Sequence, residues 1–215
     1  MSEMNAGNVS SLIIKEITGR VGCLTLNRPK ALNALNIDMV RDLTQALIEF
    51  QNNPQVLAVL VRGHGKESPF GHFCAGGDIR FFHQAALAGD ASLADFFTEE
   101  YALNHLIHTY SKPYIAFMDG VVMGGGMGIS QGASVRIVTD KTQMAMPETH
   151  IGLFPDVGGG YFLGRCPGRI GEYLGLTGQK INGQQAIQAG LADGLIEVQR
   201  LPVIWNTLLS TPFES

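Results

Sequence analysis

Two carboxylates stand in an apolar, glycine-rich segment that runs from Pro147 to Gly160. Glu148 and Asp156 lie eight residues apart in it. Burial raises the pKa of a carboxyl group, and a raised pKa suits that group to proton transfer near neutral pH. Alternatively, Glu148 caps a helix and Asp156 accepts hydrogen bonds from loop amides. Under either interpretation the carboxylates need polar partners, because an unpaired charge in apolar surroundings is strongly unfavourable.

Two glycine-rich segments could bind an anion through their backbone. In the first, Gly76 and Gly77 precede Asp78 and an apolar stretch, so Asp78 could cap a helix while the N–H of Gly77 points outward. The second, from Met123 to Gly128, lacks the spacing of a dinucleotide-binding motif and the lysine of a P-loop. Each segment alone also fits an ordinary loop or a close helix contact. Together they could supply two converging N–H donors, as acyl transfer requires.

The segments that must position these residues alternate between strands and helices. Strand patterns occupy residues 12–18, 21–26, 57–62, 114–118, 135–139, 143–146 and 195–198, and the first two form a hairpin. Helical spacing occupies residues 36–51, 79–88, 93–110, 170–176 and 184–189. This alternation predicts an α/β fold with a parallel sheet and right-handed crossovers. Ligands of such folds bind where strands end and helices begin, so the loops after Arg62 and Met118 are candidate sites.

The composition is that of one globular domain. The chain has 215 residues, 45% of them hydrophobic and 16% charged, and a net charge of −4. Because lysine and arginine form no stripe, we expect no nucleic acid partner. Three widely spaced cysteines match no disulfide or metal pattern. No apolar run reaches the ~18 residues of a membrane span, and residues 1–11 have no apolar signal core, so we expect a cytoplasmic protein with no membrane partner.

Taken in order, these segments resemble the enoyl-CoA hydratase/isomerase family, also called the crotonase superfamily. The stretch from Asn27 to Leu35 resembles it too, and the resemblance runs from about residue 12 to about residue 198. Within the family, the sequence is most similar to the 3-hydroxyisobutyryl-CoA hydrolases. The segments that carry this similarity are 74–80, 99–101, 112–114, 123–126 and 145–162.

The resemblance implies a crotonase-like spiral of repeated ββα units. It implies a short polar N-terminus at residues 1–11, an acyl-CoA-binding core at 12–200 and a short C-terminal segment at 201–215. That segment stands where the family continues with helices that close the acyl pocket and build subunit contacts. We therefore expect a homo-oligomer whose C-terminal helical region is absent or truncated.

The resemblance also assigns roles to individual residues. Gly77 and Gly125 would donate the two N–H groups of an oxyanion hole, Glu148 would be the main catalytic carboxylate, and Asp156 would be a second polar group facing the acyl moiety. Glu100 would line the acyl site. The residues along the coenzyme A path would be Lys30, Ala31, Leu32, Ala75, Asp78 and Ile79. The resemblance implies no metal or redox cofactor. Coenzyme A would be part of the substrate.

One departure from the family pattern indicates which reaction to expect. Hydratases of the family carry a second catalytic glutamate three residues after the oxyanion glycine, and here that position is Gly128. This favours hydrolysis of a short 3-hydroxyacyl-CoA thioester to the free acid and coenzyme A. The alternatives are hydratase or isomerase activity, or a scaffold that binds acyl-CoA without catalysis. If the missing carboxylate is the whole difference, Gly128→Glu should raise hydration.

Overall fold

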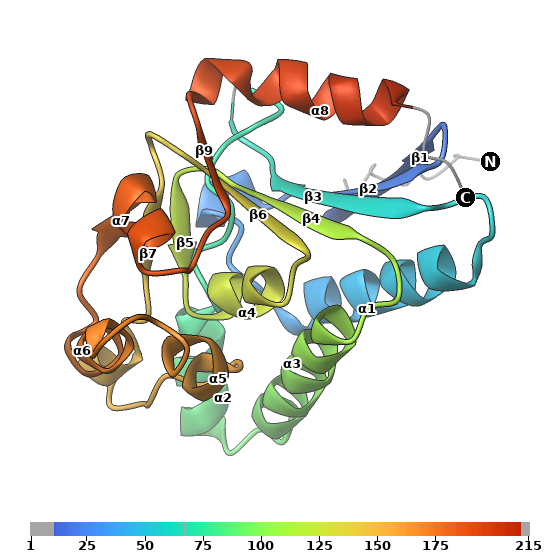
Figure 1. Ribbon diagram of the computed structural model, residues 1–215. Coiled ribbons are helices and arrows are strands. Elements are labelled where there is room, and N and C mark those ends of the chain that lie inside the picture. The colour runs from blue at the N-terminus through green and yellow to red at the C-terminus, as the bar shows by residue number, and fades with distance from the viewer. Residues whose placement is uncertain (1–10, 67, 212–215) are drawn as a thin grey trace, which may run out of the picture.

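A six-stranded sheet lies at the centre of the molecule (Figure 1). The computed structural model describes residues 11–66 and 68–211. The strand order is β1-β2-β3-β4-β6-β9; β1 pairs antiparallel with β2, and every other neighbouring pair is parallel. The strands are β1 (Ile13–Thr18), β2 (Val21–Leu26), β3 (Ala58–Gly63), β4 (Tyr114–Met118), β6 (Val135–Thr139) and β9 (Gly194–Ile196). The hairpin and the parallel sheet predicted from the sequence are confirmed.

A smaller sheet stands beside the first and has the order β5-β7-β8. Its strands are β5 (Val121–Met123), β7 (Gln143–Ala145) and β8 (Ile181–Asn182). The long strands β4 and β6 are each followed by one of these short strands and then by a helix. This repetition is the ββα spiral expected from the resemblance, so the predicted fold class is confirmed.

Helices follow the strands and cover both faces of the large sheet. In Figure 1, α1, α3 and α4 lie on one side of it and α8 on the other. The α-helices are α1 (Ile37–Asn52), α2 (Ile79–Ala88), α3 (Ser92–His108), α4 (Gly125–Gln131), α5 (Gly159–Leu163), α6 (Ile170–Thr177), α7 (Gly183–Gln188) and α8 (Leu201–Ser210). Short 3-10 helices are η1 (Pro29–Ala31), η2 (Glu148–Ile151) and η3 (Val198–Arg200). No helix within the described ranges is both long and apolar enough to cross a membrane.

Alternating side chains of the central strands divide the interior into two cores. On β2, Leu24 and Leu26 face the core under α1 and α3, whereas Val21 and Cys23 face the core under α8. The strands β3 and β4 alternate in the same way. Because successive side chains of a strand point to opposite faces, a fully apolar strand requires cover on both faces.

Helix α8 supplies the cover on the second face. Its Trp205 is 4% exposed and packs against Phe70 and Phe117, with ring centroids 5.7 and 5.2 Å apart. The guanidinium of Arg62 lies 4.4 Å from the Trp205 ring centroid. Residues 201–211 are therefore integral to the packing of the sheet. What we expected of residues 1–10 and 212–215 lies outside the described residues.

Candidate active site

The carboxyl ends of paired strands bring the glycine loops and the Glu148 segment together. β5 and β7 are parallel, with Met123 paired to Ala145, so the chain leaves both strands at the same edge. A parallel bridge between Cys74 and Val122 adds the loop that precedes α2. Residues following parallel neighbours emerge side by side. Three segments that are distant in sequence thus converge on one place.

The start of α2 is fixed by its own capping group. Oδ1 of Asp78 accepts hydrogen bonds from the N–H groups of Arg80 at 3.1 Å and Phe81 at 3.4 Å. Nη2 of Arg28 donates to Oδ2 of the same carboxylate at 2.6 Å. The N–H of Asp78 donates to the carbonyl oxygen of Leu35 at 2.8 Å, which ties the start of α2 to the segment before α1. The expected helix cap is present, and it holds the preceding Gly77 in place.

Four glycines form the floor of the site. A methyl group built on Gly125 would lie 3.4 Å from the backbone nitrogen of Gly77, and one built on Gly76 would lie 3.5 Å from the nitrogen of Gly125. Within the described part of the chain, neither Gly77 nor Gly125 donates its N–H to an acceptor. Gly124 has φ of +48°, a conformation that favours glycine. Two unused backbone donors therefore lie next to each other, as an oxyanion hole requires.

Glu148 begins η2 and reaches back over these glycines. A methyl group on Gly124 would lie 2.6 Å from its Oε1, so only a glycine leaves room for this carboxyl group. The residue is 7% exposed, and Oε2 is buried without a hydrogen-bond partner in the described structure. Burial, and secondarily the charge of Asp156, raises the pKa of Glu148 to about 7. A carboxyl group in this state can exchange a proton or act as a nucleophile near neutral pH.

Glu100 approaches the same glycines from α3. It is 2% exposed, and a methyl group on Gly125 would overlap its Oε1. That oxygen is also buried without a partner in the described structure. Burial, together with the nearby charges of Asp156 and Glu148, raises the pKa of Glu100 to about 8. Glu100 is therefore largely protonated at neutral pH, and its carboxyl group can donate a hydrogen bond into the site.

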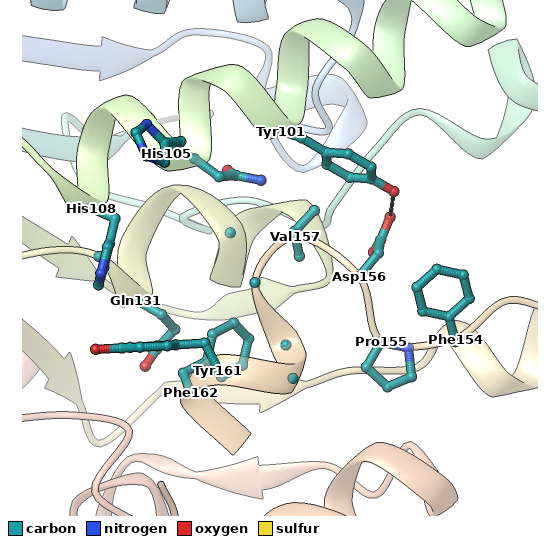
Figure 2. A pocket seen from close by; sticks show the side chains of 16 residues that line it. Tyr101, His105, His108, Gln131, Phe154, Pro155, Asp156, Val157, Tyr161 and Phe162 are labelled. Carbon is teal, nitrogen blue, oxygen red and sulfur yellow. Dashed lines mark hydrogen bonds between the residues drawn. The ribbon is translucent and has the colours of Figure 1, made fainter. Parts of the chain in front are cut away.

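Asp156 lies at the boundary between two cavities. Its Oδ2 accepts a hydrogen bond of 2.7 Å from the hydroxyl of Tyr101, as Figure 2 shows. A cavity of about 270 Å³ on one side contains Gly77, Gly125 and Glu148. A second cavity of about 620 Å³, drawn in Figure 2, extends toward Tyr161 and Phe162. The smaller cavity is the candidate catalytic one, because it is lined by both glycine donors and by the buried Glu100 and Glu148.

The residues expected along the coenzyme A path differ in whether they line the smaller cavity, lie beside it or support its backbone. Ala75 and Ile79 line the smaller cavity. Lys30 to Leu32 lie beside it without lining it, and the Leu32 carbonyl accepts from the N–H of Ala75 at 3.0 Å. Asp78 uses its N–H, its carbonyl and its carboxylate within the chain. Its position makes it a support of the Gly77 turn.

Two other potentially reactive side chains near the site make contacts within the chain. Cys74 is completely buried, and burial raises the pKa of its thiol to about 12. Nε2 of His150 is 2.8 Å from the carbonyl oxygen of Thr177. Across residues 11–66 and 68–211, no group of three or more His, Cys, Asp or Glu side chains could hold a metal ion.

Three residues that the sequence interpretation did not assign to the site contact residues of the candidate site. Tyr101 binds Asp156, while Asn104 and Val157 occupy the space beside Gly128. Helical spacing could have indicated Asn104, which lies one turn after Glu100 on α3. The contact of Val157 with Gly128 depends on loop geometry and has no signal in the sequence.

The fold brings two unused backbone N–H donors next to a buried carboxyl group, an arrangement that can polarise a carbonyl group. Residues 21–215 match the family model described as Enoyl-CoA hydratase/isomerase. The chain belongs to this family.

Several similar curated proteins carry the name 3-hydroxyisobutyryl-CoA hydrolase, mitochondrial. The protein of Xenopus tropicalis is 48% identical over 89% of this chain and 49% of its own length. The human protein is 41% identical over 92% of this chain and 50% of its own length. The chain thus spans about half the length of the curated relatives it matches. Because these relatives are named as mitochondrial, the expectation of a cytoplasmic protein is wrong.

Solved structures share the fold. A carnitinyl-CoA dehydratase from Mycobacterium thermoresistibile superposes with a TM-score of 0.89 at 42% sequence identity. The superposition covers 93% of this chain and 58% of the dehydratase chain. An enoyl-CoA hydratase from Rhodobacter sphaeroides gives a TM-score of 0.87 at 40% sequence identity, and the superposition covers 95% of this chain and 61% of the hydratase chain.

Proposed function

We propose that this chain hydrolyses a short 3-hydroxyacyl-CoA thioester of the 3-hydroxyisobutyryl-CoA type. The observation that carries the proposal is the placement of Glu148 beside two adjacent, unused N–H donors. The names of the relatives at 40–48% identity support the same substrate class. They also favour a mitochondrial location.

The proposed reaction begins with the thioester oxygen between the N–H groups of Gly77 and Gly125. As the carbonyl carbon is attacked, negative charge grows on that oxygen, and one such donor contributes about 3 kcal/mol to its stabilisation. The C–S bond then breaks and coenzyme A leaves as a thiolate, which needs little help from an acid because its pKa is near ~8.5. Glu100 and Asp156 orient the substrate hydroxyl or the attacking water.

Two routes remain for Glu148. In the first, its carboxylate attacks the carbonyl carbon and forms an anhydride, which water then cleaves to the acid and the regenerated carboxylate. In the second, it takes a proton from water, and the water oxygen attacks directly. Label in Glu148 after a single turnover in ¹⁸O-labelled water would establish the anhydride route, because only that route can place it there. Trapping of the acyl-enzyme with hydroxylamine or borohydride tests the same route where water attacks the substrate carbonyl of the anhydride.

A second candidate function is hydration or dehydration of an enoyl-CoA. The observation that favours it is the similarity to structures of a carnitinyl-CoA dehydratase and an enoyl-CoA hydratase at 42% and 40% identity. Against it stands Gly128, which supplies no second carboxylate. Free-thiol release and loss of the enoyl absorbance, measured on the same preparation, distinguish the two functions.

The proposal includes a homo-oligomer as the assembled form. Light scattering after size-exclusion chromatography measures the oligomeric state directly.

A further inference from the structure

Gly128 lies one turn into α4, and the space beside its α-carbon is already filled. A methyl group built there would lie 2.7 Å from Cβ of Val157 and 2.9 Å from Oδ1 of Asn104. Carbon atoms in favourable contact are about 3.5–4.0 Å apart. The Asn104 amide can shift by rotation, but the position of Cβ in Val157 is set by its backbone. Any side chain at position 128 therefore has to displace the loop that contains Val157.

That loop is held in an uncommon conformation. Val157 has φ of +44° although it is β-branched, and its side chain is buried at 5% exposure. Such a backbone costs on the order of 1–3 kcal/mol and persists only where the surrounding structure holds it. The close contact with Gly128 is one of the restraints that hold it.

The residue before Val157 carries the second carboxylate of the site. Figure 2 shows Asp156 and Val157 side by side, with the Asp156 carboxylate turned toward Tyr101. Tyr101 and Asn104 are three residues apart on α3, so they share one face of that helix. The loop thus touches α3 through Tyr101 and α4 through Gly128, and Asp156 lies between these contacts.

We propose that Gly128 is a positioning residue for Asp156, acting through Val157, and that Tyr101 fixes the orientation of the same carboxylate. The inference rests on the proposed hydrolase function. It gives the glycine a steric role in addition to the absence of a carboxylate. It also removes the basis for expecting that Gly128→Glu would create a hydratase, because the new side chain would displace Asp156 before it could act.

The test is a double-mutant cycle on hydrolysis of 3-hydroxyisobutyryl-CoA. We expect Gly128→Ala to lower kcat about tenfold or more with little change in KM, although alanine favours the helix by up to about 1 kcal/mol. If Gly128 acts through Asp156, Gly128→Ala should add less than about twofold to the loss caused by Asp156→Asn. Losses that multiply would overturn the proposal.

Two further variants separate positioning from general damage. Val157→Gly removes the clashing carbon and permits positive φ, so it should restore at least about half of the kcat lost in Gly128→Ala. The matched control is Gly194→Ala at the start of β9, outside both cavities, where a methyl group meets nothing within 4 Å. It should leave kcat unchanged. Failure of Val157→Gly to restore kcat in a folded protein would contradict the proposal.

A structural measurement decides the inference even if the hydrolase function is wrong. If the wild-type protein releases no thiol, the proposed function fails, but a crystal structure of Gly128→Ala still tests the positioning. We expect Val157 displaced and the bond between Tyr101 and Asp156 broken. An unmoved Val157 with the Tyr101 bond at its wild-type 2.7 Å would overturn the inference.

Discussion

Glu148 owes its chemical character to the glycine beside it. Gly124 leaves room for Oε1, and the apolar surroundings leave Oε2 without a partner in the described structure. Burial raises the pKa of this carboxyl group to about 7, and the two N–H donors lie close to it, so it can take part in proton transfer near neutral pH. The segment's apolar composition predicted burial, but the contact with Gly124 required the structure.

Replacing Glu148 by glutamine tests its role directly. We expect Glu148→Gln to lower kcat at least about a thousandfold, equivalent to about 4 kcal/mol, while the affinity for an acyl-CoA ester changes less than about threefold. Free-thiol release gives the first quantity and calorimetry the second. Retention of more than about a tenth of the wild-type rate would exclude Glu148 as the central catalyst.

The dependence of the rate on pH follows from the raised pKa. Because Glu148 acts in its ionised form, kcat/KM should rise with pH and reach half its plateau near pH 7. Asp156→Asn removes a negative charge that raises the pKa of Glu148, so the rising limb should move to lower pH. A profile that is flat between pH 5 and pH 8 would contradict this assignment.

The same pKa has a consequence for stability. A carboxyl group whose pKa is about 7 when folded and 4.5 when unfolded binds its proton more tightly in the folded protein, so stability falls as pH rises between these values. Glu148→Gln should therefore raise the free energy of unfolding at pH 8 by up to about 3 kcal/mol, with little effect at pH 4. Denaturant unfolding measures this, with the exposed Glu16→Gln as control. A variant less stable than wild type at pH 8 would refute it.

At the scale of elements, the site depends on helix starts and strand ends. The sequence predicted the α2 cap at Asp78 and the strand β4, because capping residues and apolar runs are local signals. It did not predict β5, β8 or α5, which have three, two and five residues. Elements this short are formed by tertiary pairing rather than by local preference. The pairing of β5 with β7, which brings Glu148 to the glycines, was therefore not predictable.

The junction at Asp78 should affect both stability and catalysis. Asp78→Ala removes a helix cap and the partner of Arg28, so we expect a loss of about 1–2 kcal/mol in stability and a lower kcat as Gly77 moves. Asp78→Asn keeps the capping oxygen and should retain most of the stability. Chemical denaturation and free-thiol release measure the two effects. An Asp78→Ala variant with unchanged kcat would show that Gly77 is held by other contacts.

At the scale of the whole molecule, the two faces of the large sheet differ in function. One face packs against α8 around Trp205, and the site lies on the side of α2, α3 and α4. Several large apolar side chains around the site are exposed. Ile79 and Ile151, which line the smaller cavity, are 55% and 54% exposed, and Phe154, which lines the larger one, is 70% exposed.

This apolar surface predicts binding of a hydrophobic dye by the folded chain. We expect fluorescence of an anilinonaphthalene dye to rise on mixing, and Phe154→Ser to reduce the signal, because Phe154 is both strongly exposed and part of the larger cavity. Leu87→Ser on α2 is a control outside that cavity. A folded protein with no dye fluorescence would contradict the prediction.

The central claim is that this site breaks a thioester bond, and one comparison of rates tests it most directly. Thiol release from 3-hydroxyisobutyryl-CoA and hydration of crotonyl-CoA should be measured on the same protein preparation. Glu148 lies at the two N–H donors, Glu100 beside it is largely protonated, and Gly128 stands in place of the family's second glutamate. We therefore expect kcat/KM for hydrolysis to exceed that for hydration by at least about a hundredfold, or about 2.7 kcal/mol. Efficient hydration without thiol release would contradict the claim.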